Sequence, residues 1–153
     1  MPSGLAFYKD DLNPEVYISF DDNEATNPFR ITMDGVLGGT IVKKVYLHND
    51  NPKHYYTSIT VSIYDSTSGN DYTTGDWRWK LISSEREPVP EEWDQVANLN
   101  TISISDIGTS SKANTSDFIP VWIQCTVPAG MLAANITDVY LRKTAQLGLV
   151  SDG

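Results

Sequence analysis

The chain is poor in the residue types that most catalytic and redox sites use. It has one cysteine, Cys125, so no disulfide can form within it, and it has only two histidines, His48 and His54. No serine lies in a G-x-S-x-G elbow, and Cys125 alternates with apolar residues in a predicted strand, as a small buried side chain does. Nucleophilic catalysis needs a base held beside the nucleophile. The sequence therefore predicts a protein that is not an enzyme.

The chain also lacks basic clusters and long apolar runs. Its 20 acidic residues outnumber 11 basic ones, and a formal charge of −9 repels phosphate backbones. No apolar run reaches the length of a membrane span. The first residues lack the basic start and apolar region of a secretory signal. We expect a protein of a reducing compartment that binds neither nucleic acid nor membrane.

Long helical patterns are missing as well, and the pattern that is present is that of β-strands. In residues 38–65, Ile59, Val61 and Ile63 alternate with polar residues, which is typical of a strand with one buried face. A polar loop at 48–54, containing Pro52, separates this strand from an apolar stretch at 41–47. We interpret the two arms as neighbouring strands of a central hairpin.

The rest of the chain repeats this pattern. Further strands are predicted at 15–20, 29–33, 77–81, 101–107, 118–127 and from 139, with a helical turn at 91–96 that points Trp93 inward. About eight short strands indicate an all-β fold, an antiparallel β-sandwich of immunoglobulin-like or jelly-roll type. We expect a single domain over 15–146, between an N-terminal arm at 1–14 and a C-terminal tail at 147–153.

Two sets of residues follow from this organisation. The predicted core consists of apolar residues at inward strand positions: Val45, Leu47, Ile59, Val61, Ile63, Trp79, Leu81, Val121, Ile123, Val139 and Leu141. The predicted interface consists of apolar and aromatic residues in the arm, the loops and the tail: Phe7, Tyr8, Tyr55, Tyr56, Tyr72 and Leu149. The arm and the tail are expected to become ordered on a neighbouring protein.

Binding sites for small ligands have weaker support in the sequence. His48, Asp50 and His54 share one loop, but three ligands without further support do not define a transition-metal site. Residues 65–71 have the oxygen-rich look of a calcium loop without the closing glutamate of an EF-hand. We therefore predict no metal and no cofactor. Tyr55, Tyr56 and Tyr72 are candidates for exposed rings, and together with the polar loop at 66–76 they leave open a carbohydrate-binding module.

Two stretches resemble the small structural proteins of tailed bacteriophages. VYLHND at 45–50, followed by ITVSI at 59–63, resembles a strand–loop–strand unit common in that group. Trp93, ISDI at 104–107 and IPVWIQCTVPAG at 119–130 resemble a second pattern of the same proteins. The resemblance covers most of residues 38–145.

This resemblance implies a β-sandwich without enzymatic activity, made in the host cytoplasm and present in many copies on the virion. Its partners would be capsid, neck or tail proteins and further copies of itself. The expected function is capsid decoration or a head-fibre or collar component. The alternatives are a neck or tail accessory protein and a carbohydrate-binding host-adhesion module.

Overall fold

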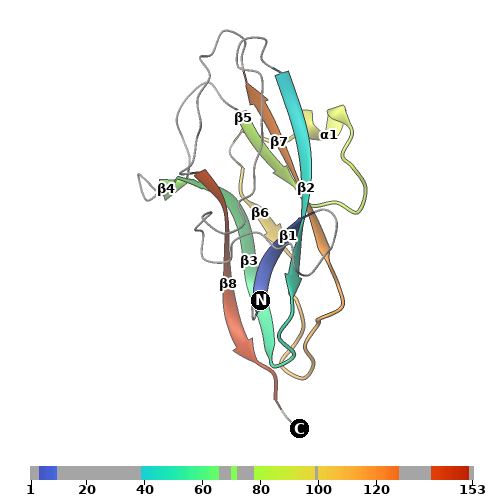
Figure 1. Cartoon of the computed structure of the whole chain (residues 1–153), viewed down its shortest axis with the longest axis vertical. Helices are drawn as coiled ribbons and strands as arrows, with labels where there is room; N and C mark the ends of the chain where they lie inside the picture. Colours follow the sequence, from blue (N-terminus) through green and yellow to red (C-terminus); the bar gives the residue numbers. More distant parts are fainter. Residues whose placement is uncertain are drawn as a thin grey trace.

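The computed structural model describes residues 4–9, 39–65, 70–71, 78–98, 100–127 and 139–151. These residues form two antiparallel sheets (Figure 1). The first has the order β1-β2-β7-β5 and contains β1 (Leu5–Lys9), β2 (Gly39–Asn49), β7 (Ile119–Val127) and β5 (Arg78–Ile82). In the second, β3 (His54–Asp65) pairs with β4 (Asn70–Asp71), β6 (Ile102–Ile104) and β8 (Val139–Leu149). The prediction of an all-β, antiparallel sandwich is confirmed.

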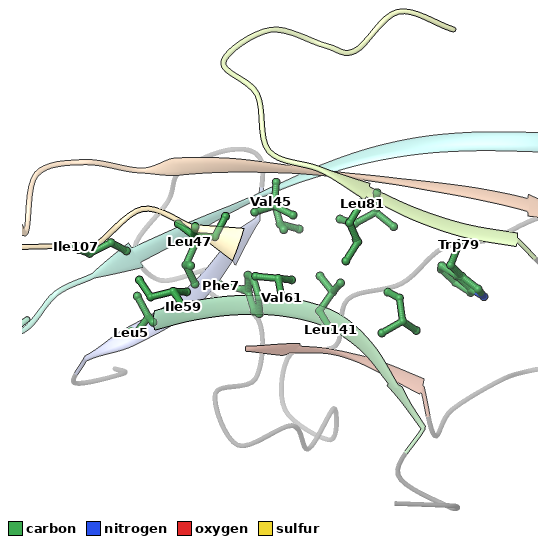
Figure 2. Packing of buried hydrophobic residues seen from close by; sticks show 14 of the residues in the cluster. Leu5, Phe7, Val45, Leu47, Ile59, Val61, Trp79, Leu81, Ile107 and Leu141 are labelled. Carbon is green, nitrogen blue, oxygen red and sulfur yellow. The ribbon is translucent and has the colours of Figure 1, made fainter. Parts of the chain in front are cut away.

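The core lies between the two sheets (Figure 2). Alternation along each strand points every second side chain into it. All predicted core side chains that the structure describes are buried: Val45, Leu47, Ile59, Val61, Ile63, Trp79, Leu81, Val121, Ile123 and Leu141. Val139 begins β8, and its side chain lies outside the described part. Cys125 is also buried, in β7, which pairs with β2 on one side and β5 on the other.

The predicted helical turn is present as α1 (Pro90–Asp94). Proline is well suited to the first turn of a helix, where its missing N–H is not needed. The Glu92 carboxylate accepts the backbone N–H of Val89 at 3.0 Å, which satisfies one of the free donors at this end. Trp93 is buried, as expected from the sequence.

The predicted central hairpin is wrong. β2 and β3 lie in different sheets, so the chain between them crosses from one layer to the other. The side chain of Asn49, which is fully buried, holds this corner: its Nδ2 donates to the carbonyls of Asn51 at 3.2 Å and His54 at 3.1 Å. Turn-forming residues show that a chain reverses direction, but they do not specify which strand it then pairs with.

The predicted N-terminal arm is also wrong over the residues that the structure describes. Leu5–Lys9 form β1, which pairs antiparallel with β2 from Leu5 opposite Asn49 to Lys9 opposite Val45. Phe7 and Tyr8, expected at an interface with another protein, are 4% and 2% exposed. Phe7 belongs to the core between the sheets, whereas the Tyr8 ring packs edge-on against His48 and Phe118. Both aromatic rings are therefore used inside the domain.

Several other expectations fall outside the described residues. The strands predicted at 15–20 and 29–33 and most of the loop at 66–76 lie there, as does Tyr72. The C-terminal tail, in contrast, is described almost to its end. β8 continues to Leu149, into the segment predicted as a tail, and the backbone N–H of Val150 still bonds the carbonyl of Lys53 at 2.9 Å.

Candidate interaction surface on the last strand

The pairing of β3 with β8 contains one irregularity that determines which side chains face inward. Tyr56 lies opposite Leu147 and Thr57 opposite Gln146, but the next pair is Thr60 with Thr144. β3 thus has one residue more than β8 across this interval, which is a β-bulge. Ser58 in the bulge has a φ of 53°, in the left-handed region. The bulge shifts the alternation of β3 by one residue, while β8 has no extra residue in this interval.

The register places two leucines of β8 on the core-facing side of the second sheet. Directly opposed residues in an antiparallel pair point to the same face. Tyr56 belongs to the core, so Leu147 opposite it shares that face, and so does Leu149 opposite His54. Leu141, further up the strand, is buried opposite Ile63.

The first sheet does not extend over these two leucines. β1 reaches β3 where the backbone N–H of Leu5 donates to the Tyr56 hydroxyl at 3.2 Å. It reaches β8 where the Lys143 ammonium lies 5.6 Å from the Phe7 ring centroid. Beyond these contacts Leu147 is 58% exposed and Leu149 is 72% exposed. An apolar strip on the inner face of β8 therefore remains in contact with solvent.

The backbone of the same residues forms an open sheet edge. The N–H of Val150 points to β3, where it bonds Lys53, and peptide groups alternate in direction along a strand. The N–H and C=O groups of Leu147 and Leu149 consequently point away from β3. Among the described residues no strand pairs with β8 on that side, as Figure 1 also shows for its lower half. Free backbone groups and exposed leucines thus occur on the same two residues, which is the arrangement that accepts another strand.

The end of β8 is held firmly on its outer face. Tyr55 lies opposite Gly148, and a Cβ at Gly148 would overlap Cε1 and Cζ of the Tyr55 ring. The ring therefore crosses β8 at a position where only glycine leaves room for it. Further along, the N–H and hydroxyl of Ser151 both donate to the carbonyl of Ser110, at 2.8 and 3.1 Å. These contacts fix the strand while its edge stays open.

The structure distributes the predicted interface residues differently from the expectation. Tyr56, expected to be exposed, is buried in the core because the bulge at Ser58 turns it inward. Tyr55 is half-buried and points to the opposite face, against Gly148. The two rings therefore do not form the shared exposed surface that a sugar would need. Leu149 is exposed as expected, and Leu147, which the sequence pattern does not single out, is exposed on the same strand.

The residues considered for metal binding have separate structural roles. His48 is buried, its ring is stacked on Phe118 with centroids 3.8 Å apart, and its Nδ1 lies 2.8 Å from the carbonyl of Asp117. The Asp50 carboxylate accepts the N–H of Gly4 at 2.6 Å, and His54 Nδ1 lies 3.4 Å from the Tyr56 hydroxyl. Within the described ranges no three His, Cys, Asp or Glu side chains converge on one point. Residues 66–69 of the expected calcium loop lie outside those ranges.

The thiol of Cys125 is packed in the hydrophobic core. Cys125 is completely buried, and burial raises the pKa of its thiol to about 12 because the charged form would lose its hydration. The neutral thiol is a poor nucleophile. Cys125 thus behaves as an apolar side chain of the core.

Comparison with known proteins adds no relative to this description. No protein-family model, curated protein or solved structure matches the chain. In the part of the chain that the structure describes, no helix combines the length and apolarity needed to cross a bilayer. The surface on β8 must therefore be interpreted from its own geometry.

Proposed function

We propose that this protein is a non-enzymatic structural component that assembles with other proteins through the open edge of β8. The observation that carries the proposal is the coincidence of exposed Leu147 and Leu149 with backbone groups that point away from β3. Solvated leucines on an open strand edge promote association with other chains, and soluble proteins usually protect such edges. An edge that is both apolar and rigidly held suits a building block.

The resemblance to small structural proteins of tailed bacteriophages supports a more specific proposal. In it the protein is a virion component, either a capsid decoration or a part of a head fibre or collar, with a neck or tail accessory as the alternative. The compact β-sandwich supports this, because a stable block that presents one strand can be added repeatedly to a particle. The acidic surface, at −9 per chain, keeps such a block soluble before assembly.

The test is incorporation into particles. Virus particles purified from the source should contain the protein in a fixed ratio to the major capsid protein, measured by quantitative mass spectrometry. A count in the hundreds indicates decoration, and a small multiple of six indicates the neck or tail. Complete absence from the particles would overturn the virion proposal.

The same particles test the role of β8. The double variant Leu147→Asp/Leu149→Asp should fold normally, because both side chains are exposed, but should be lost from the particles. Val89→Asp is the matched control, since Val89 is another exposed apolar residue, at 43%, next to α1 and away from β8 (Figure 1). Equal incorporation of the two variants would show that the β8 edge is not the contact.

A further inference from the structure

We propose that the open edge of β8 pairs with the same edge of a second copy of this chain, antiparallel, with the twofold axis at Gly148. This inference rests on the proposed function, because it names the partner for the same surface. The pairing would join the second sheets of the two copies into one continuous sheet.

The register follows from the inner face of the strand. With the axis at Gly148, Leu147 of one copy lies opposite Leu149 of the second, and the reverse pair forms across the axis. These are the residues whose backbone groups point outward, so each pair can exchange two hydrogen bonds. Every exposed leucine on this edge then meets a leucine.

The outer face fits the same register. Tyr55 overlies Gly148, and a Cβ at Gly148 would lie 2.7 Å from its hydroxyl oxygen, so the ring extends across β8 toward the open edge. Opposed residues that are not hydrogen-bonded to each other lie about 4.5 Å apart at Cα. The two glycines at the axis would therefore bring the two Tyr55 rings together. Leucines on one face and tyrosines on the other enclose the new backbone hydrogen bonds.

The charged side chains of β8 itself do not oppose this arrangement. β8 contains no acidic residue, and its basic residues are at 142 and 143. With the axis at Gly148, the two copies of Lys143 are separated by ten residue steps, about 33 Å at 3.3 Å per residue. That distance exceeds the Debye length of about 8 Å at physiological ionic strength.

The contact is small, and its size determines its strength. Three side chains and one short strand from each copy bury much less than the roughly 800 Å² per partner of a stable complex. The pair should therefore be weak in dilute solution and form at the high local concentration of a repeated assembly. A weak, repeated contact between identical chains is suited to a component present in many copies.

Disulfide trapping tests both the partner and the register. Leu147→Cys and Leu149→Cys are made as separate single variants in the full chain and mixed at equal concentration under mild oxidation. A bridge between residue 147 of one copy and residue 149 of the other suits the Cα separation of about 5.5 Å for a hydrogen-bonded pair. The mixture should yield at least about tenfold more covalent dimer than either variant alone, because only the mixture places two thiols opposite each other.

The controls make each outcome decisive. Leu147→Cys mixed with Val89→Cys should give only background dimer, and the buried Cys125 should remain unmodified. If Leu147→Cys alone gives as much dimer as the mixture, the axis is not at Gly148 and the proposed register is overturned. Absence of dimer from the mixture at millimolar concentration overturns self-pairing.

The particle experiment separates this inference from the proposed function. Incorporation that depends on Leu147 and Leu149, without any trapped dimer, would mean that a different protein supplies the strand. In that case self-pairing fails and the structural role stands. Trapped dimer in solution together with absence from particles would give the opposite result: self-pairing stands and the virion proposal fails.

Discussion

Two adjacent polar side chains, His48 and Asn49, show how this domain uses polar groups in its interior. Burying a polar group costs free energy unless it forms hydrogen bonds. His48 Nδ1 lies within hydrogen-bonding distance of the Asp117 carbonyl, and the Asn49 amide bonds the backbone on both sides of the corner between the sheets. Each side chain thus fixes the course of the backbone. The polar loop at 48–54 is therefore a structural corner.

Cys125 leads to a prediction about alkaline stability. Its thiol pKa is raised to about 12 in the folded protein, whereas an exposed cysteine titrates near 8.5. The unfolded chain therefore loses this proton at lower pH than the folded one. The stabilisation is fully present below about pH 8.5 and is lost progressively as pH rises toward 12, by at most about 1.4 kcal/mol per pH unit.

The measurement compares wild type with Cys125→Ala in urea unfolding at several pH values between 7 and 11. Lysines and tyrosines titrate in both proteins, so their effects cancel in the difference. Wild type should be the more stable protein at pH 7, because alanine leaves a cavity, and its advantage should shrink above pH 9. A constant difference across this range would show that the thiol is not desolvated in the folded state.

At the scale of elements, the regular strands could be predicted from the sequence and the exceptions could not. Alternation identified the inward residues of β3 from Ile59 onward, and the apolar run at 118–127 corresponds to β7, which is paired on both sides. Simple alternation from Ile59 would point Tyr56 outward, whereas the structure buries it. The extra residue in the bulge turns the Tyr56 side chain inward, and no residue type near Ser58 predicts a bulge there.

The errors at β1 and at the corner have a different cause. β1 contains consecutive buried residues because it is covered on both faces, by the core and by the aromatic group around His48. Such a short run without alternation is ambiguous in sequence. Whether β2 pairs with β3 depends on contacts with β1 and β7, which are distant along the chain. On β8, the sequence indicates Leu149 as a surface residue. The exposure of Leu147 and the open edge follow only from the pairing register of β8 with β3.

The bulge itself can be tested by substitution. The φ of 53° at Ser58 lies in the left-handed region, which β-branched residues strongly disfavour. Ser58→Val should lower the free energy of unfolding by about 1–2 kcal/mol, measured by urea denaturation. Ser103→Val, at an exposed serine of the neighbouring strand β6, should change it by less than about 0.5 kcal/mol. Equal effects of the two substitutions would argue against the left-handed conformation at Ser58.

At the scale of the whole molecule, the charge distribution and the open edge act in opposite directions. The chain carries −9 overall, while β8 contains only basic and neutral residues. Two approaching copies therefore repel each other through their net charge, whereas the proposed attraction is a short-range contact at the edge of β8. Net repulsion keeps free copies apart, and a specific short-range contact selects one orientation when they are brought together.

This balance determines how salt should affect self-association. Raising the ionic strength from about 0.01 M to about 0.5 M shortens the Debye length from about 30 Å to a few ångströms and removes most of the repulsion between copies. The leucine and backbone contacts at the edge do not depend on attraction between charges. The dissociation constant measured by sedimentation equilibrium should therefore fall several-fold over this range.

The opposite response would identify a different contact. If the basic residues at 142 and 143 bound the acidic surface of a neighbouring copy, salt would weaken the association instead of strengthening it. Leu147→Asp/Leu149→Asp should abolish association at every salt concentration if the edge pairs with itself, whereas an electrostatic contact through residues 142 and 143 would survive that change at low salt. Both measurements therefore report on β8, where the exposed leucines and the open backbone edge form the proposed contact.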